Sequence, residues 1–216
     1  MGRGILYAFW FTPCQFRNSR AYAEAEWRTV PRYNCSQLRY VRFGFENMEK
    51  HLPPRSLSHD IFLDVPPTEV WSLITQPGHL EKVHPYCKSN EVLKWDLDGC
   101  KDILLYSNGR RFVRRIEPWI EGIGYNLWIG EEGGPQSYVE WRIEPTNNGY
   151  CYLRIRIYPY LLSRWPSLLA ALPFKFWVHR RLMNYLKAVL SGIKFHLKTG
   201  NSVPRDQPNS HPWFSA

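Results

Sequence analysis

Apolar residues recur at alternating steps of three and four in the last quarter of the chain. The series consists of Phe176, Met183, Leu186, Leu190, Ile193 and Leu197, and the polar His179 interrupts it at one position of the same spacing. This spacing places its members on one face of an α-helix, and it predicts a long helix over about residues 173–198. Because such a face needs another layer to cover it, we expect the helix to lie across a sheet.

Short runs with strand-forming residues come before this helix. Six of them lie close together at about residues 89–95, 101–107, 111–117, 123–130, 137–144 and 150–158, and an earlier one covers 60–65. The pair Asn108-Gly109 is a strong hairpin signal, and the other connections in the group of six are also short. Consecutive strands are therefore expected to be antiparallel. Residues 67–74 and 79–83 have the pattern of two short helices after the first strand.

Alternation within the strands indicates which face is solvated. Leu153, Ile155 and Ile157 fall on one side of the last strand, and Arg154 and Arg156 fall on the other. One face of the sheet is thus expected to meet the helix and the other to meet water. In residues 123–130 both sides are apolar or small, so alternation leaves open which side faces inward, and an error of one residue would exchange the faces.

Charge and composition narrow the function classes. The net charge is +9, but the Lys and Arg residues form no long run and no known nucleic-acid motif occurs, so we expect no nucleic acid as partner. No stretch has the length of a transmembrane helix, because Arg164, Pro166, Pro173 and Lys175 interrupt the most apolar one. Five cysteines without a CxxC pair favour free thiols in a reducing compartment, so we expect a cytoplasmic protein.

Composition also divides the chain. Residues 1–47 contain seven Arg, no Lys and three acidic residues, and they show no sustained period. We expect an extension of unclear structure, either disordered or not native to the domain; an Arg-rich transit peptide is the alternative. The remaining chain is expected to form one domain over residues 48–200, followed by a tail over residues 201–216.

The element order and two local motifs resemble a known superfamily. The run from Val65 to Trp71 (VPPTEVW), followed by His84-Pro85, and the ending from Leu190 to Gly200 with the later His-Pro-Trp-Phe carry the likeness. Together they resemble the START/SRPBCC superfamily over about residues 58–214. The resemblance implies an α+β helix-grip fold, in which a curved antiparallel sheet of about seven strands wraps around the long C-terminal helix, with two short helices after the first strand.

The resemblance also implies a hydrophobic cavity between the sheet and the helix, filled by a lipid, a polyketide or an aromatic molecule. We expect no cofactor, because the iron–sulfur portion that an oxygenase of this superfamily would need does not occur in the sequence. From the helix stripe and the inner sheet face, the expected ligand-binding residues are Trp71, Tyr106, Phe112, Arg114, Asn126, Trp128, Trp141, Ile155, His179, Met183 and Leu186, with His84 at the cavity mouth.

Three polar residues in this set carry the candidate chemistry. His179 and His84 are either structural or able to orient a ligand or exchange a proton. Arg114, if it faces inward, needs a carboxylate or an anionic ligand, since an unpaired buried charge is costly. A metal site is disfavoured because His79, His84 and Cys87 have no second ligand cluster. The sequence also lacks a nucleophile elbow and a phosphate-binding glycine loop.

These observations favour binding or transport of a hydrophobic small molecule. The alternative is a polyketide cyclase- or dehydratase-like enzyme that uses an ionisable pair in the same cavity, such as His179 or His84 with Arg114 or a tyrosine. A third hypothesis concerns the apolar connection before the helix, since Leu161–Trp177 would suit transient contact with a membrane surface.

Overall fold

The structure is a computed structural model that describes residues 52–96, 99–163, 165–205 and 211–215. The extension expected over residues 1–47 lies outside these ranges. In chain order, the described elements are β1 (Leu57–Leu63), α2 (Pro67–Ile74), α3 (Leu80–Val83), β2 (Cys87–Asp96), β3 (Gly99–Tyr106), β4 (Arg111–Ile120), β5 (Gly124–Gly130), β6 (Gln136–Pro145), β7 (Cys151–Tyr158), α4 (Ser167–Pro173), the π-helical turn η4 (Phe174–Val178) and α5 (His179–Thr199).

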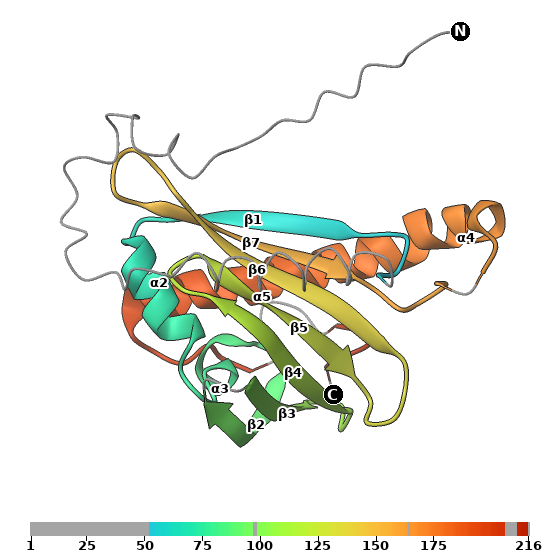
Figure 1. The fold of residues 1–216 in the computed structure, drawn as a ribbon, viewed down its shortest axis with the longest axis horizontal. Coiled ribbons are helices and arrows are strands. Elements are labelled where there is room, and N and C mark those ends of the chain that lie inside the picture. Colours follow the sequence, from blue (N-terminus) through green and yellow to red (C-terminus); the bar gives the residue numbers. More distant parts are fainter. Residues whose placement is uncertain (1–51, 97–98, 164, 206–210, 216) are drawn as a thin grey trace, which may run out of the picture.

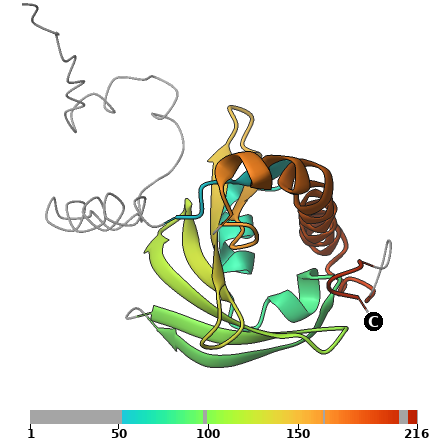
Figure 2. The same cartoon turned by 90° about the vertical axis from the view of Figure 1, so that its right-hand side faces the viewer.

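The strands form one antiparallel sheet of seven strands within the described ranges, in the order β1-β7-β6-β5-β4-β3-β2. Short hairpins join β2 through β7, while β1 pairs with β7 from Leu57↔Ile157 to Leu63↔Cys151. The sheet curves, and α5, α2 and α3 lie on its concave side (Figures 1 and 2). This arrangement confirms the predicted helix-grip fold class.

The long helical region begins earlier than predicted. Residues 167–173, expected to be part of a connection, already form α4. Pro173 lies inside this run, and a proline there removes one backbone hydrogen bond and crowds the preceding turn. The π-helical turn η4 follows directly, before α5 begins at His179.

The π-helical turn also explains why the predicted stripe is rotated at its N-terminal end. A π-helical turn holds more residues than an α-helical turn, so it changes which side chains face the sheet. The buried positions are Phe174, Val178, Leu182, Leu186, Ala188, Val189, Leu190, Gly192 and Ile193. Leu186, Leu190 and Ile193 agree with the prediction, but Phe176 is 69% exposed and therefore faces away from the sheet.

The inward face of β5, which alternation left open, is not the one that carries the expected lining residues Asn126 and Trp128. Tyr125 and Leu127 belong to the buried core. Asn126 lies instead opposite Glu140 on the outer face, where its Oδ1 accepts a hydrogen bond of 2.6 Å from Arg142 Nη2. Trp128 packs on Tyr138 on the same outer side, with ring centroids 4.9 Å apart. Both faces of β5 carry large or apolar side chains, which is why alternation did not identify the inner one.

Close packing fixes α5 against α3. A Cβ atom on Gly192 would lie 2.2 Å from the carbonyl oxygen of Val83, so only glycine allows this approach. After α5, the backbone N–H of Val203 donates to the carbonyl of Lys82 at 2.9 Å. The helix ends at Gly200, which adopts the left-handed conformation (φ 71°) common after a helix C-terminus. These contacts hold α3, and the residue that follows it, beside the middle of α5.

Candidate functional site

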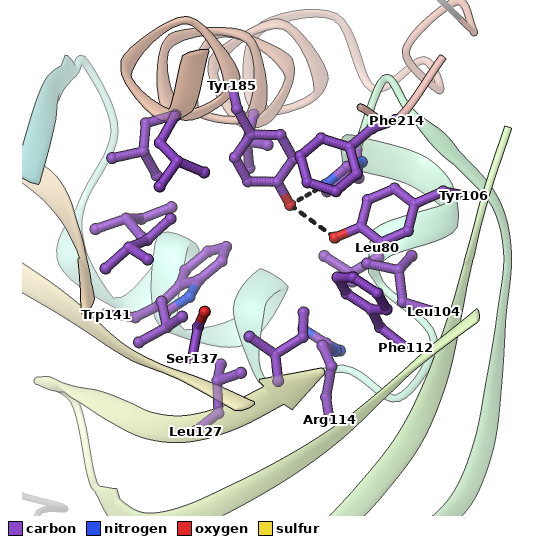
Figure 3. Close-up of a pocket in the computed structure, with 18 residues that line it drawn as sticks. Leu80, Leu104, Tyr106, Phe112, Arg114, Leu127, Ser137, Trp141, Tyr185 and Phe214 are labelled. Atoms are coloured by element: carbon purple, nitrogen blue, oxygen red, sulfur yellow. Dashed lines mark hydrogen bonds between the residues drawn. The ribbon is translucent and has the colours of Figure 1, made fainter. Parts of the chain in front are cut away.

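A cavity lies between the concave face of the sheet and α5 (Figure 3). Its free space is about 90 Å³. Its walls are mainly aliphatic and aromatic side chains: Leu80, Leu104, Phe112, Leu127, Ile129, Val139, Trp141, Ile155, Ile157, Leu182, Leu186, Val189 and Phe214. The polar lining is limited to His84, Tyr106, Arg114, Ser137 and Tyr185. Such an interior suits a molecule with a largely apolar surface and few polar groups.

A chain of hydrogen bonds joins three of the polar lining residues. His84 follows α3 in an extended conformation, which the next residue, Pro85, favours. Its Nε2 lies 2.8 Å from the hydroxyl of Tyr185 on α5. That hydroxyl lies 3.2 Å from the hydroxyl of Tyr106, at the end of β3. Three elements distant in sequence thus place their polar groups at one end of the cavity, as Figure 3 shows for the two tyrosines.

The tautomer of His84 follows from its backbone contact. The N–H of Tyr86 donates to Nδ1 of His84 at 3.2 Å, so Nδ1 is the acceptor and the neutral ring carries its proton on Nε2. Burial, with the nearby Arg114 charge, lowers the pKa of His84 to about 3. The ring is therefore neutral at physiological pH, and its Nε2–H donates to the oxygen of Tyr185.

The two tyrosines are neutral for a related reason. Burial raises the pKa of Tyr185 to about 12. Burial, together with the neighbouring Tyr185, raises the pKa of Tyr106 well above its usual value. Burial is the first cause in each case because it disfavours the charged phenolate. Both hydroxyls therefore keep their hydrogens near neutral pH.

Arg114 lines the cavity from β4, but its charge is already balanced. It lies opposite Asp102 of β3. Arg114 is 2% exposed and Asp102 is 0% exposed. Arg114 Nε donates to Asp102 Oδ1 at 2.7 Å, and Nη2 donates to Asp102 Oδ2. This two-point geometry is the strong form of the arginine–carboxylate interaction. The carboxylate that a buried Arg114 requires is therefore Asp102.

A segment after α5 closes one side of the cavity. Phe214 is 7% exposed; its ring stacks on Tyr106 at 4.5 Å between centroids and packs on Tyr185 at 4.8 Å. His211 holds the segment in place: its Nε2 lies 3.0 Å from the carbonyl oxygen of Arg181, and its Nδ1 accepts from Trp213 N–H. Figure 3 shows Phe214 beside the tyrosine pair, so this ring takes up space that a ligand would otherwise fill.

Seven of the twelve expected residues line the cavity: His84, Tyr106, Phe112, Arg114, Trp141, Ile155 and Leu186. The other five do not. Asn126 and Trp128 lie on the outer face of β5, and His179 and Met183 are half-buried beside the buried positions of α5. Trp71 packs edge-to-face on Trp119, with centroids 5.8 Å apart, and so belongs to an aromatic cluster beyond the cavity.

Two lining residues with direct importance were missed. The sequence could have indicated Tyr185. Together with Leu182, Leu186 and Val189 it has the spacing of one helix face, just as the predicted stripe has. Phe214 has no such signal, because a single aromatic residue after a helix carries no periodicity. Only the folded chain shows that it reaches the tyrosine pair.

Comparison with known proteins supports the fold. No protein-family model matches the chain, and no curated protein matches it. Among solved structures, a START superfamily protein from Mycobacterium smegmatis is similar with a TM-score of 0.53 and 11% identity, covering 68% of this chain and 99% of that one. A protein of unknown function, SA2116 from Staphylococcus aureus, has a TM-score of 0.51 and 12% identity, covering 68% and 96%.

A third similar structure is Ara h 8.0201, with a TM-score of 0.50 and 14% identity over 67% of this chain and 98% of that one. In all three cases, this chain spans almost the whole length of the solved structure. Identities this low carry the architecture and not the activity. The chain has the helix-grip fold of the START/SRPBCC superfamily, as the sequence resemblance predicted.

Proposed function

We propose that the protein binds and carries a hydrophobic small molecule in the cavity between the sheet and α5. The main support is the lining itself, which is apolar except for a few polar groups, most of them paired with one another. Superfolds of this kind host many activities, so the lining of the site and not the fold alone supports this function.

The size of the cavity adds a condition to this proposal. An apolar protein cavity of roughly 150 Å³ is known to bind benzene, and the space here is about 90 Å³. A ligand of ordinary size therefore needs more room than the closed structure has. Phe214 can supply it, since this ring lies at the edge of the cavity and belongs to a short segment after α5, although it stacks on Tyr106 of β3. We therefore propose that the Phe214 ring moves out of its packed position when a ligand binds.

The neutral dye N-phenyl-1-naphthylamine, whose fluorescence rises in apolar surroundings, tests this proposal. Phe214→Ala should bind the dye roughly tenfold or more tightly than the wild type, because the dye no longer has to expel a packed ring. Phe195→Ala is a matched control, since Phe195 is 39% exposed and does not line the cavity. The proposal is wrong if neither wild type nor Phe214→Ala binds the dye and native mass spectrometry of the purified protein finds no co-purified small molecule.

A cyclase- or dehydratase-like activity has less support from the same geometry. General acid–base catalysis is most efficient when the pKa of the group lies near the working pH. His84 and Tyr185 have pKa values of about 3 and about 12, and Arg114 is committed to Asp102. His179, the other candidate, lies outside the lining. The site therefore fits binding better than proton transfer.

We also propose that the outer face of α4 and η4 contacts an anionic membrane surface. Trp165, Leu169, Leu172, Phe176 and Trp177 are between 47% and 69% exposed, although all are large and apolar. Clustered exposure of this kind is unusual on a surface without a partner. In Figure 1, α4 projects past the end of the sheet, where such side chains could enter a lipid interface.

The charge distribution matches this partner. Residues 145–205 contain ten Lys and Arg residues and no Asp or Glu. Arg180, Arg181 and Lys187 line a groove of about 540 Å³ on the outer side of α5, next to Phe176 and Trp177. Basic groups beside exposed aromatic rings suit the anionic headgroups and the interface of a bilayer. None of the helices in the described ranges is long and apolar enough to cross a membrane.

Sedimentation with vesicles tests the contact. The protein should bind vesicles with phosphatidylserine more tightly than pure phosphatidylcholine vesicles, and salt should weaken the binding. Leu169→Ser/Leu172→Ser should lower the affinity roughly tenfold. Val92→Ser/Leu93→Ser, which changes two exposed apolar residues of β2, should leave it unchanged. Equal losses in the two variants would contradict a specific role for α4.

The thiols bear on the cellular setting. Cys87, Cys100 and Cys151 are free and buried in the described part of the chain. Burial raises the pKa of Cys87 to about 12 and that of Cys151 to about 11, so both stay protonated and unreactive. We propose a reducing, cytoplasmic setting on this basis. Thiol titration of freshly isolated, unfolded protein tests it: recovery of bonded cysteines would contradict it.

A further inference from the structure

The hydrogen-bond chain at one end of the cavity allows the hydrogens to be counted. His84 Nε2–H donates to the Tyr185 oxygen, since Nδ1 of the same ring accepts from the backbone. The two phenols share one bond with each other, and either can be its donor. If Tyr185 donates to Tyr106, the hydrogen of Tyr106 is left over; if Tyr106 donates, that of Tyr185 is left over.

One phenol hydrogen therefore remains without an acceptor in both arrangements. Within the described residues, the structure gives Tyr106 and Tyr185 no hydrogen-bond partner besides each other and His84. Both residues line the cavity, and their hydroxyls point into it in Figure 3. A buried O–H without an acceptor is costly, so this hydrogen is a built-in donor for whatever fills the cavity.

The charges of the site limit the net charge that a bound ligand can carry. Arg114 is the charged residue of the lining, and Asp102 takes both its Nε and one Nη donor. The ion pair is therefore neutral as a unit. A ligand carboxylate would enter an apolar space with no uncompensated positive charge to receive it, and burying an unpaired carboxylate is very unfavourable.

We propose that the cavity selects a neutral hydrophobic molecule with a hydrogen-bond acceptor, such as a ketone or ester oxygen, which receives the free hydrogen of the Tyr106–Tyr185 pair. This inference rests on the proposed function of the cavity. In the empty protein, water can accept the same hydrogen. A ligand that displaces this water without an acceptor of its own loses affinity.

Three probes of similar size separate the possibilities: acetophenone has a carbonyl acceptor, ethylbenzene has none, and benzoate carries a negative charge. Their dissociation constants are measured by NMR titration with the wild-type protein and with Phe214→Ala, which has more room. Acetophenone should bind roughly tenfold more tightly than ethylbenzene, and benzoate should bind more weakly than both. The infrared band of the bound acetophenone carbonyl should shift to lower frequency, as expected for a hydrogen-bonded ketone.

A variant assigns the donor. In Tyr106→Phe/Tyr185→Phe, both phenol hydrogens are gone, so acetophenone should lose its advantage and its carbonyl band should return toward the unbonded position. If the shift persists in this variant, another donor holds the carbonyl and the inference is overturned. If the variant does not fold, the wild-type affinity ratio and infrared band still decide.

The outcomes also separate this inference from the function it rests on. Ethylbenzene binding as tightly as acetophenone, or benzoate binding best, overturns the inference and leaves the carrier in place. Failure of all three probes to bind either protein overturns the carrier and the inference together.

Discussion

Mild acid should destabilise this fold through two buried histidines. His79 and His84 are 1% and 4% exposed, and burial is the main cause that lowers the pKa of each to about 3. Arg114 adds to the effect in both cases, while the Asp102 charge acts in the opposite direction on His79. Tyr185 and Tyr106 are the neutral groups on the cavity side of His84. The folded protein therefore keeps both rings neutral, whereas the unfolded chain protonates them near pH 6.5.

The sign and the size follow from proton linkage. Between pH 6.5 and about pH 3, the unfolded state binds one more proton per histidine than the folded state. The free energy of unfolding is thus largest above pH 6.5 and falls as the pH falls, by about 1.4 kcal/mol per pH unit for each histidine. Because the histidines of the unfolded chain are already half protonated at pH 6.5, the loss from pH 6.5 to pH 4.5 is about 5 kcal/mol for the two histidines together. This is a large part of the stability of an ordinary domain.

Urea unfolding followed by tryptophan fluorescence measures this loss at pH 7.5, 6.5, 5.5 and 4.5. His79→Asn is the informative variant, because Asn can still donate to the Gln76 carbonyl that Nδ1 of His79 contacts at 2.8 Å. His84→Gln similarly keeps a donor for Tyr185. Each variant should lose about half of the pH dependence that the two histidines cause. The carboxylates contribute about equally to wild type and variants, so their contribution cancels in the comparison.

A parallel loss of stability in wild type and both variants between pH 6.5 and pH 4.5 would show that the two histidines do not cause the acid sensitivity. A wild type as stable at pH 4.5 as at pH 7.5 would contradict the prediction as well, because two buried neutral histidines could not then be present.

Two further substitutions test the packing that shapes the site. Asp102→Asn should lower the free energy of unfolding, measured in urea, by about 3–5 kcal/mol, because it leaves the Arg114 charge buried without its partner. The paired change Asp102→Leu/Arg114→Met should recover most of this loss. Failure to recover it would mean that the buried charge is not the cause. Gly192→Ala should destabilise by about 2 kcal/mol despite the better helix propensity of Ala, since its Cβ would lie 2.2 Å from the Val83 oxygen. Ser191→Ala, at the exposed neighbouring position, should have little effect, and an equal loss there would point to the helix and not to the contact with α3.

Much of the architecture could be predicted because strong local signals coincide with it. The Asn108-Gly109 turn, the alternation of β7 and the heptad-like spacing around Leu186 each depend on neighbours a few residues away. The site was harder to predict for three distinct physical reasons. The faces of β5 differ too little in polarity, a π-helical turn shifts the start of the helix stripe, and Phe214 reaches the cavity through a contact with no local pattern.

Among the polar residues, too, some could be identified from the sequence and others could not. His84 and Arg114 could be named as candidates because charge and imidazole are rare in apolar runs. Their partners could not be named, since Asp102 and Tyr185 lie on other elements and become neighbours only through strand register and helix rotation. Long-range pairing of this kind depends on the whole fold.

The pairing of β1 with β7 has a consequence for how the chain reaches this state. Leu57 and Ile157 are adjacent in the sheet yet one hundred positions apart in the sequence. During synthesis, β1 emerges long before β7, so β1 stays unpaired while the five hairpins that join β2 to β7 are made. Contacts between such distant segments slow folding, and a chain interrupted before β7 would expose an unpaired strand that can join another chain instead.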